Sequence, residues 1–99
     1  MSCNRTQLCG RLETRGALRF SPAGVAIVEF SIAHRSDQLE AEALRKVECL
    51  IKAVATEQLA QRVAKFPIGA PIKATGFLAK TGRSNLALVL HVQNIELIE

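Results

Sequence analysis

The residues whose types could carry out chemistry are two histidines, three cysteines and a short acidic run, and their spacing decides what they can do. His34 and His91 each stand alone in an apolar segment, with no cysteine or carboxylate at metal-ligand spacing. Asp37, Glu40 and Glu42 lie close together, but no histidine or further acid completes a cation site. No P-loop, GxSxG motif or HExxH motif occurs. The sequence therefore predicts a protein that is not an enzyme and holds no metal or cofactor, with the histidines in the core or at its rim.

The cysteines indicate a reducing compartment. Cys3, Cys9 and Cys49 are an odd number, and no CxxC pair occurs. Cys9 and Cys49 lie in apolar, strand-like segments, which predicts that they are small core residues. Residues 1–10 lack the hydrophobic region of a signal peptide, and no apolar run approaches the ~20 residues of a membrane span. We therefore expect a cytoplasmic protein that does not contact a membrane.

The charge suits a polyanionic partner without requiring one. The 99 residues hold 13 Lys and Arg against 9 Asp and Glu, which gives a net charge of +4. This length predicts a single domain, residues 1–99, with one core. The aromatic residues are all Phe, so that core must be mainly aliphatic.

Alternation of apolar and polar residues predicts five strands and one helix. The clearest strand follows a Ser-Pro-Ala-Gly turn at 21–24 and alternates with period two as far as Ser36. The spacing becomes helical over 56–66, with Thr56 as N-cap and Pro67 as the stop. The other predicted strands are 4–13, 44–54, 72–79 and 85–91, with the apolar pattern continuing to 98 and a mobile loop tip at 37–42.

This order predicts an all-β fold, a five-stranded OB-fold barrel with one short helix between strands three and four. Such barrels bind single-stranded nucleic acid on the face of strands two and three. Other small barrels share parts of the same order.

Several stretches resemble a known family. They are FSPAGVAIVEFSIAHRS at 20–36, Leu44-Arg45, Cys49, Gly76-Phe77 and LVLHVQNIELIE at 88–99. In these stretches the chain resembles primosomal replication protein N, the PriB family, in register over about 4–99 except in the loop between strands four and five. The resemblance implies a homodimeric OB-fold of replication restart that binds single-stranded DNA, the PriA helicase and a further loading factor.

The chain departs from this family where bases can stack. Family members can carry aromatic residues on strand three and at its approach, and the corresponding positions here are Ala43 and Glu48. Each stacked base contributes ~1–3 kcal/mol, and the carboxylate of Glu48 repels phosphate. The sequence therefore predicts DNA binding that is weak, mainly electrostatic and nearly independent of base sequence.

Basic residues near the predicted binding face are the candidate phosphate contacts. Lys46 and Lys52 share a strand face with Glu48, whereas Arg45 has the opposite parity and needs a loop position or a β-bulge to reach the same side. Solvated surface charge is the alternative for every candidate. The candidates are Arg19, Arg35, Arg45, Lys46, Lys52, Lys80 and Arg83.

Two of these cations lie in a predicted hairpin tip. Lys80 and Arg83 flank Gly82, and a flexible basic loop of this kind can close over a DNA strand. Two other functions compete with the primosome role. One is a general single-strand binding protein, and the other is a protein-interaction module with little DNA affinity, which Glu48 favours.

Apolar strands predict how the chain associates. The segments 72–79 and 85–92 are long and carry few charges, so each would be a poorly guarded sheet edge. Pairing of one such edge with its copy about a two-fold axis would produce a homodimer. The alternative is that both segments are interior strands of a monomer.

Overall fold

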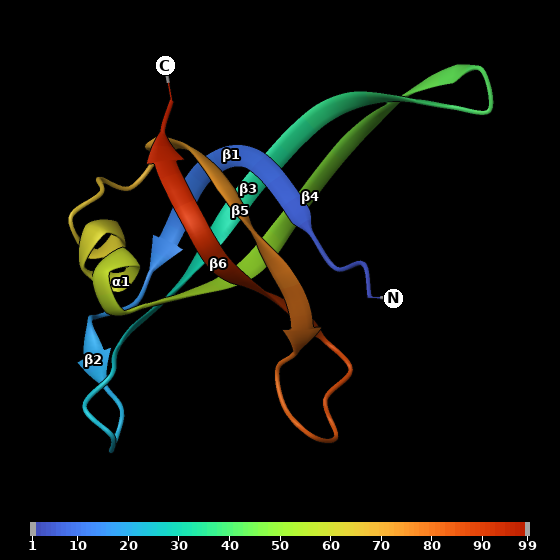
Figure 1. Ribbon diagram of the computed structural model, residues 1–99. Coiled ribbons are helices and arrows are strands. Elements are labelled where there is room, and N and C mark those ends of the chain that lie inside the picture. Colours follow the sequence, from blue (N-terminus) through green and yellow to red (C-terminus); the bar gives the residue numbers. More distant parts are fainter. Residues whose placement is uncertain (1, 99) are drawn as a thin grey trace.

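The computed structural model describes residues 2–98, which form six strands and one helix (Figure 1). The five long strands and the helix follow the predicted order, and a two-residue strand, β2, is additional. The elements are β1 (Thr6–Arg15), β2 (Arg19–Phe20), β3 (Ala26–Glu40), β4 (Ala43–Thr56), α1 (Glu57–Ala64), β5 (Pro71–Lys80) and β6 (Leu88–Leu97).

The long strands close into a barrel of mixed direction. Hydrogen-bonded neighbours follow the order β1-β5-β6-β4-β3, and a further pairing of β1 with β3 completes the circle. β4 and β6 run parallel where they meet, and the other neighbours are antiparallel. α1 lies at one end of the barrel (Figure 1). The predicted five-stranded barrel, with its helix between the third and fourth long strands, is confirmed.

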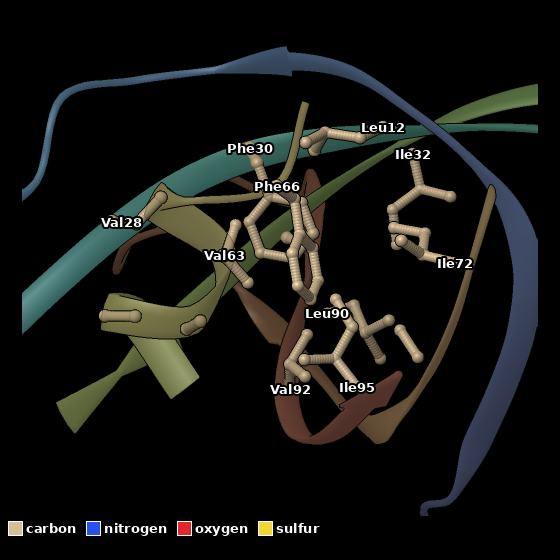
Figure 2. Close-up of a cluster of buried hydrophobic side chains, with 14 of the residues drawn as sticks. Leu12, Val28, Phe30, Ile32, Val63, Phe66, Ile72, Leu90, Val92 and Ile95 are labelled. Carbon is tan, nitrogen blue, oxygen red and sulfur yellow. The ribbon is translucent and has the colours of Figure 1, made fainter. Parts of the chain in front are cut away.

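Aliphatic side chains fill the barrel, as the composition predicts. On β3 the even-numbered residues Ala26, Val28, Phe30 and Ile32 are buried, because alternate residues of a strand point to one side. The other strands and the helix add their inward residues to the same cluster (Figure 2). The largest side chains that are fully buried are Leu12, Val28, Ile32, Val63, Ile72, Leu90 and Ile95.

The helix is shorter than predicted. α1 ends at Ala64, although Phe66 is still buried because the chain turns back over the core. Thr56 has the extended backbone of an N-cap (φ −129°, ψ 158°), but its side chain makes no capping hydrogen bond. Ala60 and Val63 provide the buried face. No helix within residues 2–98 is long and apolar enough to cross a membrane.

A close approach of two strands at Gly76 sets the register of β5 and β6. The register shifts between Thr75 and Gly76, which marks a β-bulge. A Cβ atom at Gly76 would clash with the His91 carbonyl and would lie 3.0 Å from the Cα of Val92. After the bulge Phe77 lies opposite His91, and the two rings stack with centroids 5.0 Å apart. His91 is therefore half-buried against the barrel, within the range predicted for it.

Beyond the barrel, β3 and β4 continue as a two-stranded arm, which we define as residues 34–49 (Figure 1). The two strands pair without interruption as far as Glu40 and Ala43, and the turn contains Ala41 and Glu42 alone. Both turn residues have positive φ (51° and 66°), as the two-residue turn that matches strand twist requires. The prediction of a loop at 37–42 is therefore wrong. The polar residues there belong to strands whose two faces are both exposed to solvent.

The cysteine prediction is also wrong. Cys9 and Cys49 are exposed and free. Cys9 points away from the core because its neighbour Leu8 points inward, and Cys49 lies in the arm, past the end of the barrel. Alternation in a sequence predicts which residues lie on the same face of a strand. It does not predict at which residue the strand leaves the barrel.

The two apolar segments expected to form exposed sheet edges lie inside the barrel sheet instead. β5 pairs with β1 at one edge and β6 at the other, and β6 also meets β4 at Leu90 and His91. The last strand begins at Leu88, later than the predicted residue 85. Among the described residues, β1 pairs with β3 only from Arg11 onward, so its segment 6–10 has one edge without a strand partner. The edge argument for 72–79 and 85–92 is therefore wrong.

Candidate nucleic-acid interface

The outer face of β2, β3 and β4 carries four of the seven candidate cations. Residues directly opposite each other in an antiparallel ladder point to the same side. Because the even-numbered residues of β3 fill the core, its odd-numbered residues and their partners on β4 point outward. Ser31 lies opposite Lys52, Arg35 opposite Glu48, and Asp37 opposite Lys46. Arg19, from β2, lies opposite Ile27 on the same face.

A hollow of about 720 Å³ lies where β1 crosses beside β3 and β4. Arg35 is the candidate cation that lines it. Arg11 of β1 also lines it and was not among the candidates, because the sequence does not show which strand packs beside β3. Leu50, which is 61% exposed, adds an apolar surface. The lining residues are Cys9, Gly10, Arg11, Glu13, Ala33, His34, Arg35, Glu48, Cys49, Leu50, Pro71 and Ile98.

A second hollow, of about 360 Å³, adjoins the first along the arm. It shares Arg35 and Glu48 with the first hollow and adds Asp37 and Lys46. The structure therefore brings Arg35 and Lys46 together. Lys52 lies further along β4, toward the barrel, and is exposed.

Three of the candidate arginines form ion pairs with carboxylates on the same sheet. The Arg19 guanidinium is 3.4 Å from the Glu29 carboxylate, and both side chains are exposed. Arg35 is 3.6 Å from Glu48. The three pairs are Arg19–Glu29, Arg35–Glu48 and Arg45–Glu40.

Arg45 points away from the other candidates on β4. It lies opposite Gln38 within an unbroken ladder, so neither a loop nor a bulge aims it toward Lys46 and Lys52. Its Nε lies 2.6 Å from Glu40 Oε1, and the two side chains form an ion pair. A single straight DNA segment on the outer face would therefore meet Lys46 and Lys52 but not Arg45.

Lys80 ends β5 and Arg83 lies in the loop between β5 and β6, apart from both hollows. The Lys80 ammonium donates to the Arg83 carbonyl at 3.3 Å, and Thr81 N–H donates to the Ala87 carbonyl. The loop and the arm extend from different ends of the barrel (Figure 1). A DNA strand that touches both must therefore cross the outer face of the barrel.

Two further polar residues have structural partners. His34 Nδ1 lies 2.7 Å from the Cys9 carbonyl, which accepts, so Nδ1 carries the proton. Its Nε2 lies 2.8 Å from the Ser36 hydroxyl. The imidazole thus links β1 to the base of the arm at the rim of the barrel, as predicted. Further along β1 and outside both hollows, the Arg15 guanidinium donates to the Phe66 carbonyl.

Comparison with known proteins identifies the family. Residues 4–94 match a family model described as another single-strand binding protein family. Replication restart protein PriB of Nitrosomonas europaea is 35% identical over 99 residues, covering 98% of this chain and 92% of that protein. The chain belongs to the PriB family. PriB of Bordetella pertussis is 37% identical over 90 residues, covering 91% of this chain and 84% of that protein.

Solved structures agree with this PriB assignment. PriB from Ralstonia solanacearum has a TM-score of 0.89 and 33% identity, covering 99% of this chain and 100% of that one. A small single-stranded DNA-binding protein from Streptomyces coelicolor has a TM-score of 0.73 at 18% identity, covering 99% of this chain and 95% of that one. The second likeness shows the shared fold and confirms the OB-fold prediction. The matched family is a binding family, which confirms the prediction that this PriB-family chain is not an enzyme.

Proposed function

We propose that this protein is an accessory of the replication-restart primosome that holds single-stranded DNA mainly through phosphate contacts. The observation that carries this proposal is a PriB-family barrel whose outer face presents Lys46, Lys52 and Arg35 beside two adjoining hollows. Lys and Arg side chains bind phosphate with little regard to base sequence. Lys80 and Arg83 extend the DNA path to the loop between β5 and β6.

The distribution of aromatic rings supports electrostatic binding. Phe30 and Phe66 are buried, and Phe77 is half-buried against His91. Phe20 is 64% exposed but belongs to β2. The outward positions of β3 and β4, all within the described chain, hold no aromatic residue. Bases therefore have no ring to stack on along these two strands, and the phosphate contacts supply most of the affinity.

The protein partners in this proposal are the PriA helicase, a further loading factor and a second copy of the chain. Family resemblance supports the first two. For the dimer, the unpartnered edge of β1 at 6–10 offers backbone N–H and C=O groups to the same edge of a copy. A two-fold pairing there would be self-limiting. We place this single-domain protein, residues 1–99, in the cytoplasm.

The second candidate function is a protein-interaction OB module with little DNA affinity. The three arginine–carboxylate pairs favour it, because paired arginines contribute less positive potential to the face. A general single-strand binding role is the third.

Binding of a fluorescent oligothymidine, measured by anisotropy at low salt, tests the proposal. We expect the Lys46→Ala, Lys52→Ala double variant to bind several-fold more weakly than the wild type. Lys65→Ala is the control, because Lys65 is exposed, follows α1 and lines neither hollow. Equal losses in both variants, or no binding by the wild type, would favour the interaction module.

A further inference from the structure

Three of the seven candidate DNA contacts are arginines that the protein's own carboxylates engage. All six side chains are more than half exposed, so DNA can reach them. Phosphate that approaches one of these arginines competes with the carboxylate or lies beside it. The pairs are Arg19–Glu29, Arg35–Glu48 and Arg45–Glu40.

The strand register places the two residues of each pair next to each other on one face of the sheet. Arg35 and Glu48 lie directly opposite each other, and in the other two pairs the residues are diagonal neighbours on one face. Long side chains in both arrangements can reach each other across the sheet. The carboxylates therefore stay near the arginines when DNA arrives.

We infer that Glu29 and Glu48 limit the DNA affinity of this protein by neutralising Arg19 and Arg35 on the outer face, so that the lysines and the β5–β6 loop carry the binding. This inference rests on the proposed function and concerns how strongly that same face holds DNA. Each paired carboxylate cancels the positive charge that its arginine would offer to phosphate, and once phosphate binds that arginine the carboxylate lies within one Debye length and repels it.

Within residues 2–98, the remaining four candidate cations form no ion pair with a carboxylate. Lys52 lies opposite Ser31, a neutral residue. Lys46 lies opposite Asp37, yet no ion pair joins them in residues 2–98. Lys80 donates to a backbone carbonyl, and Arg83 makes no ion pair in the same part of the chain. Four of the seven candidates are thus available to phosphate without displacing a carboxylate.

Neutral, same-shape substitutions test the inference. We expect Glu29→Gln and Glu48→Gln each to tighten oligothymidine binding about threefold to tenfold at low salt, and Glu40→Gln to have a smaller effect because Arg45 points away from the outer face. Glu57→Gln is the control, because it changes net charge equally but lies at the start of α1 and makes no ion pair within residues 2–98. It should change affinity less than twofold. Salt dependence gives a second readout: at ~0.7 per phosphate contact, the slope should rise from about 2.8 with four contacts to about 4.2 with six contacts in the triple variant, because Arg45 points away from the outer face.

A double-mutant cycle asks whether Glu48 acts through Arg35. Arg35→Gln should cost less than twofold in the wild-type background and at least threefold when combined with Glu48→Gln. Equal effects in both backgrounds, or a Glu57→Gln gain as large as that of Glu48→Gln, would overturn the inference. If the wild type binds weakly and the triple variant binds well, the inference stands. If neither protein binds oligothymidine, the proposed function fails and this inference falls with it.

Discussion

Arg35 and Glu48 lie directly opposite each other on β3 and β4, with the guanidinium 3.6 Å from the carboxylate. This pair borders both hollows of the outer face. An exposed ion pair of this kind contributes little to folding stability, typically ~0–1 kcal/mol. Its larger consequence is for ligands, because a carboxylate lies beside an arginine on the surface that we propose for DNA.

Replacing Glu48 with Trp should tighten binding of single-stranded DNA. The substitution removes the carboxylate and adds a ring on which a base can stack, worth ~1–3 kcal/mol. Glu48→Gln is the control, since it removes the charge without adding a ring. Titration of labelled oligothymidine should rank the affinities Trp, then Gln, then wild type. If the Trp variant folds and binds no better than the wild type, position 48 does not face the DNA.

The β5–β6 loop should contribute through its two cations. We expect a Lys80→Ala, Arg83→Ala double variant to lose affinity and to lower the salt slope by about 1.4, the equivalent of two phosphate contacts. Lys65→Ala should leave the slope unchanged. A double variant with the wild-type slope would show that DNA does not reach this loop.

The bulge at Gly76 provides a test of the fold. Gly76→Ala should destabilise the protein by ~2–3 kcal/mol, because the new Cβ meets backbone atoms of β6 that cannot move aside. Gly82→Ala is the matched control, since no heavy atom lies within 4 Å of a Cβ there, and its effect should stay within about 0.5 kcal/mol. Urea unfolding followed by circular dichroism measures both values. Equal stability of the two variants would mean that β5 and β6 are spaced differently.

Much of the barrel could be predicted from the sequence, because its strands bury one face and alternate strictly. The alternation from Ala26 to Ile32 fixes an inward face, and the change to helical spacing after Thr56 places the helix. The sequence predicts strands that reach Ser36 and start again at Leu44, but not the pairing of residues 37–40 in the arm, because strands that are exposed to solvent on both faces have the composition of a loop. The arm is the reason that Cys49 is exposed.

The candidate site was predictable in part. The parity of Lys46, Lys52 and Arg45 follows from sequence alone, and the ladder bears it out. The ion pairs do not follow, because they depend on which residue of β3 faces which residue of β4. Arg11 was missed for the same kind of reason, since only the crossing of β1 beside β3 brings it to the hollow.

A homodimer is expected in solution. Sedimentation equilibrium at micromolar concentration should give about twice the 10.8 kDa mass of the chain. The β1 edge at 6–10 would pair with its copy and satisfy its free backbone groups. A mass near that of one chain across the concentration range would refute the dimer.

The salt dependence of single-stranded DNA binding tests the central claim most directly. Affinity of the wild-type protein for a labelled oligothymidine is measured over a range of sodium chloride concentrations, and log K is plotted against log salt. Binding through phosphate contacts predicts a steep linear fall, ~0.7 for each contact made by a cation. An affinity that hardly changes with salt would contradict the account, because it would mean that something other than Lys and Arg holds the DNA.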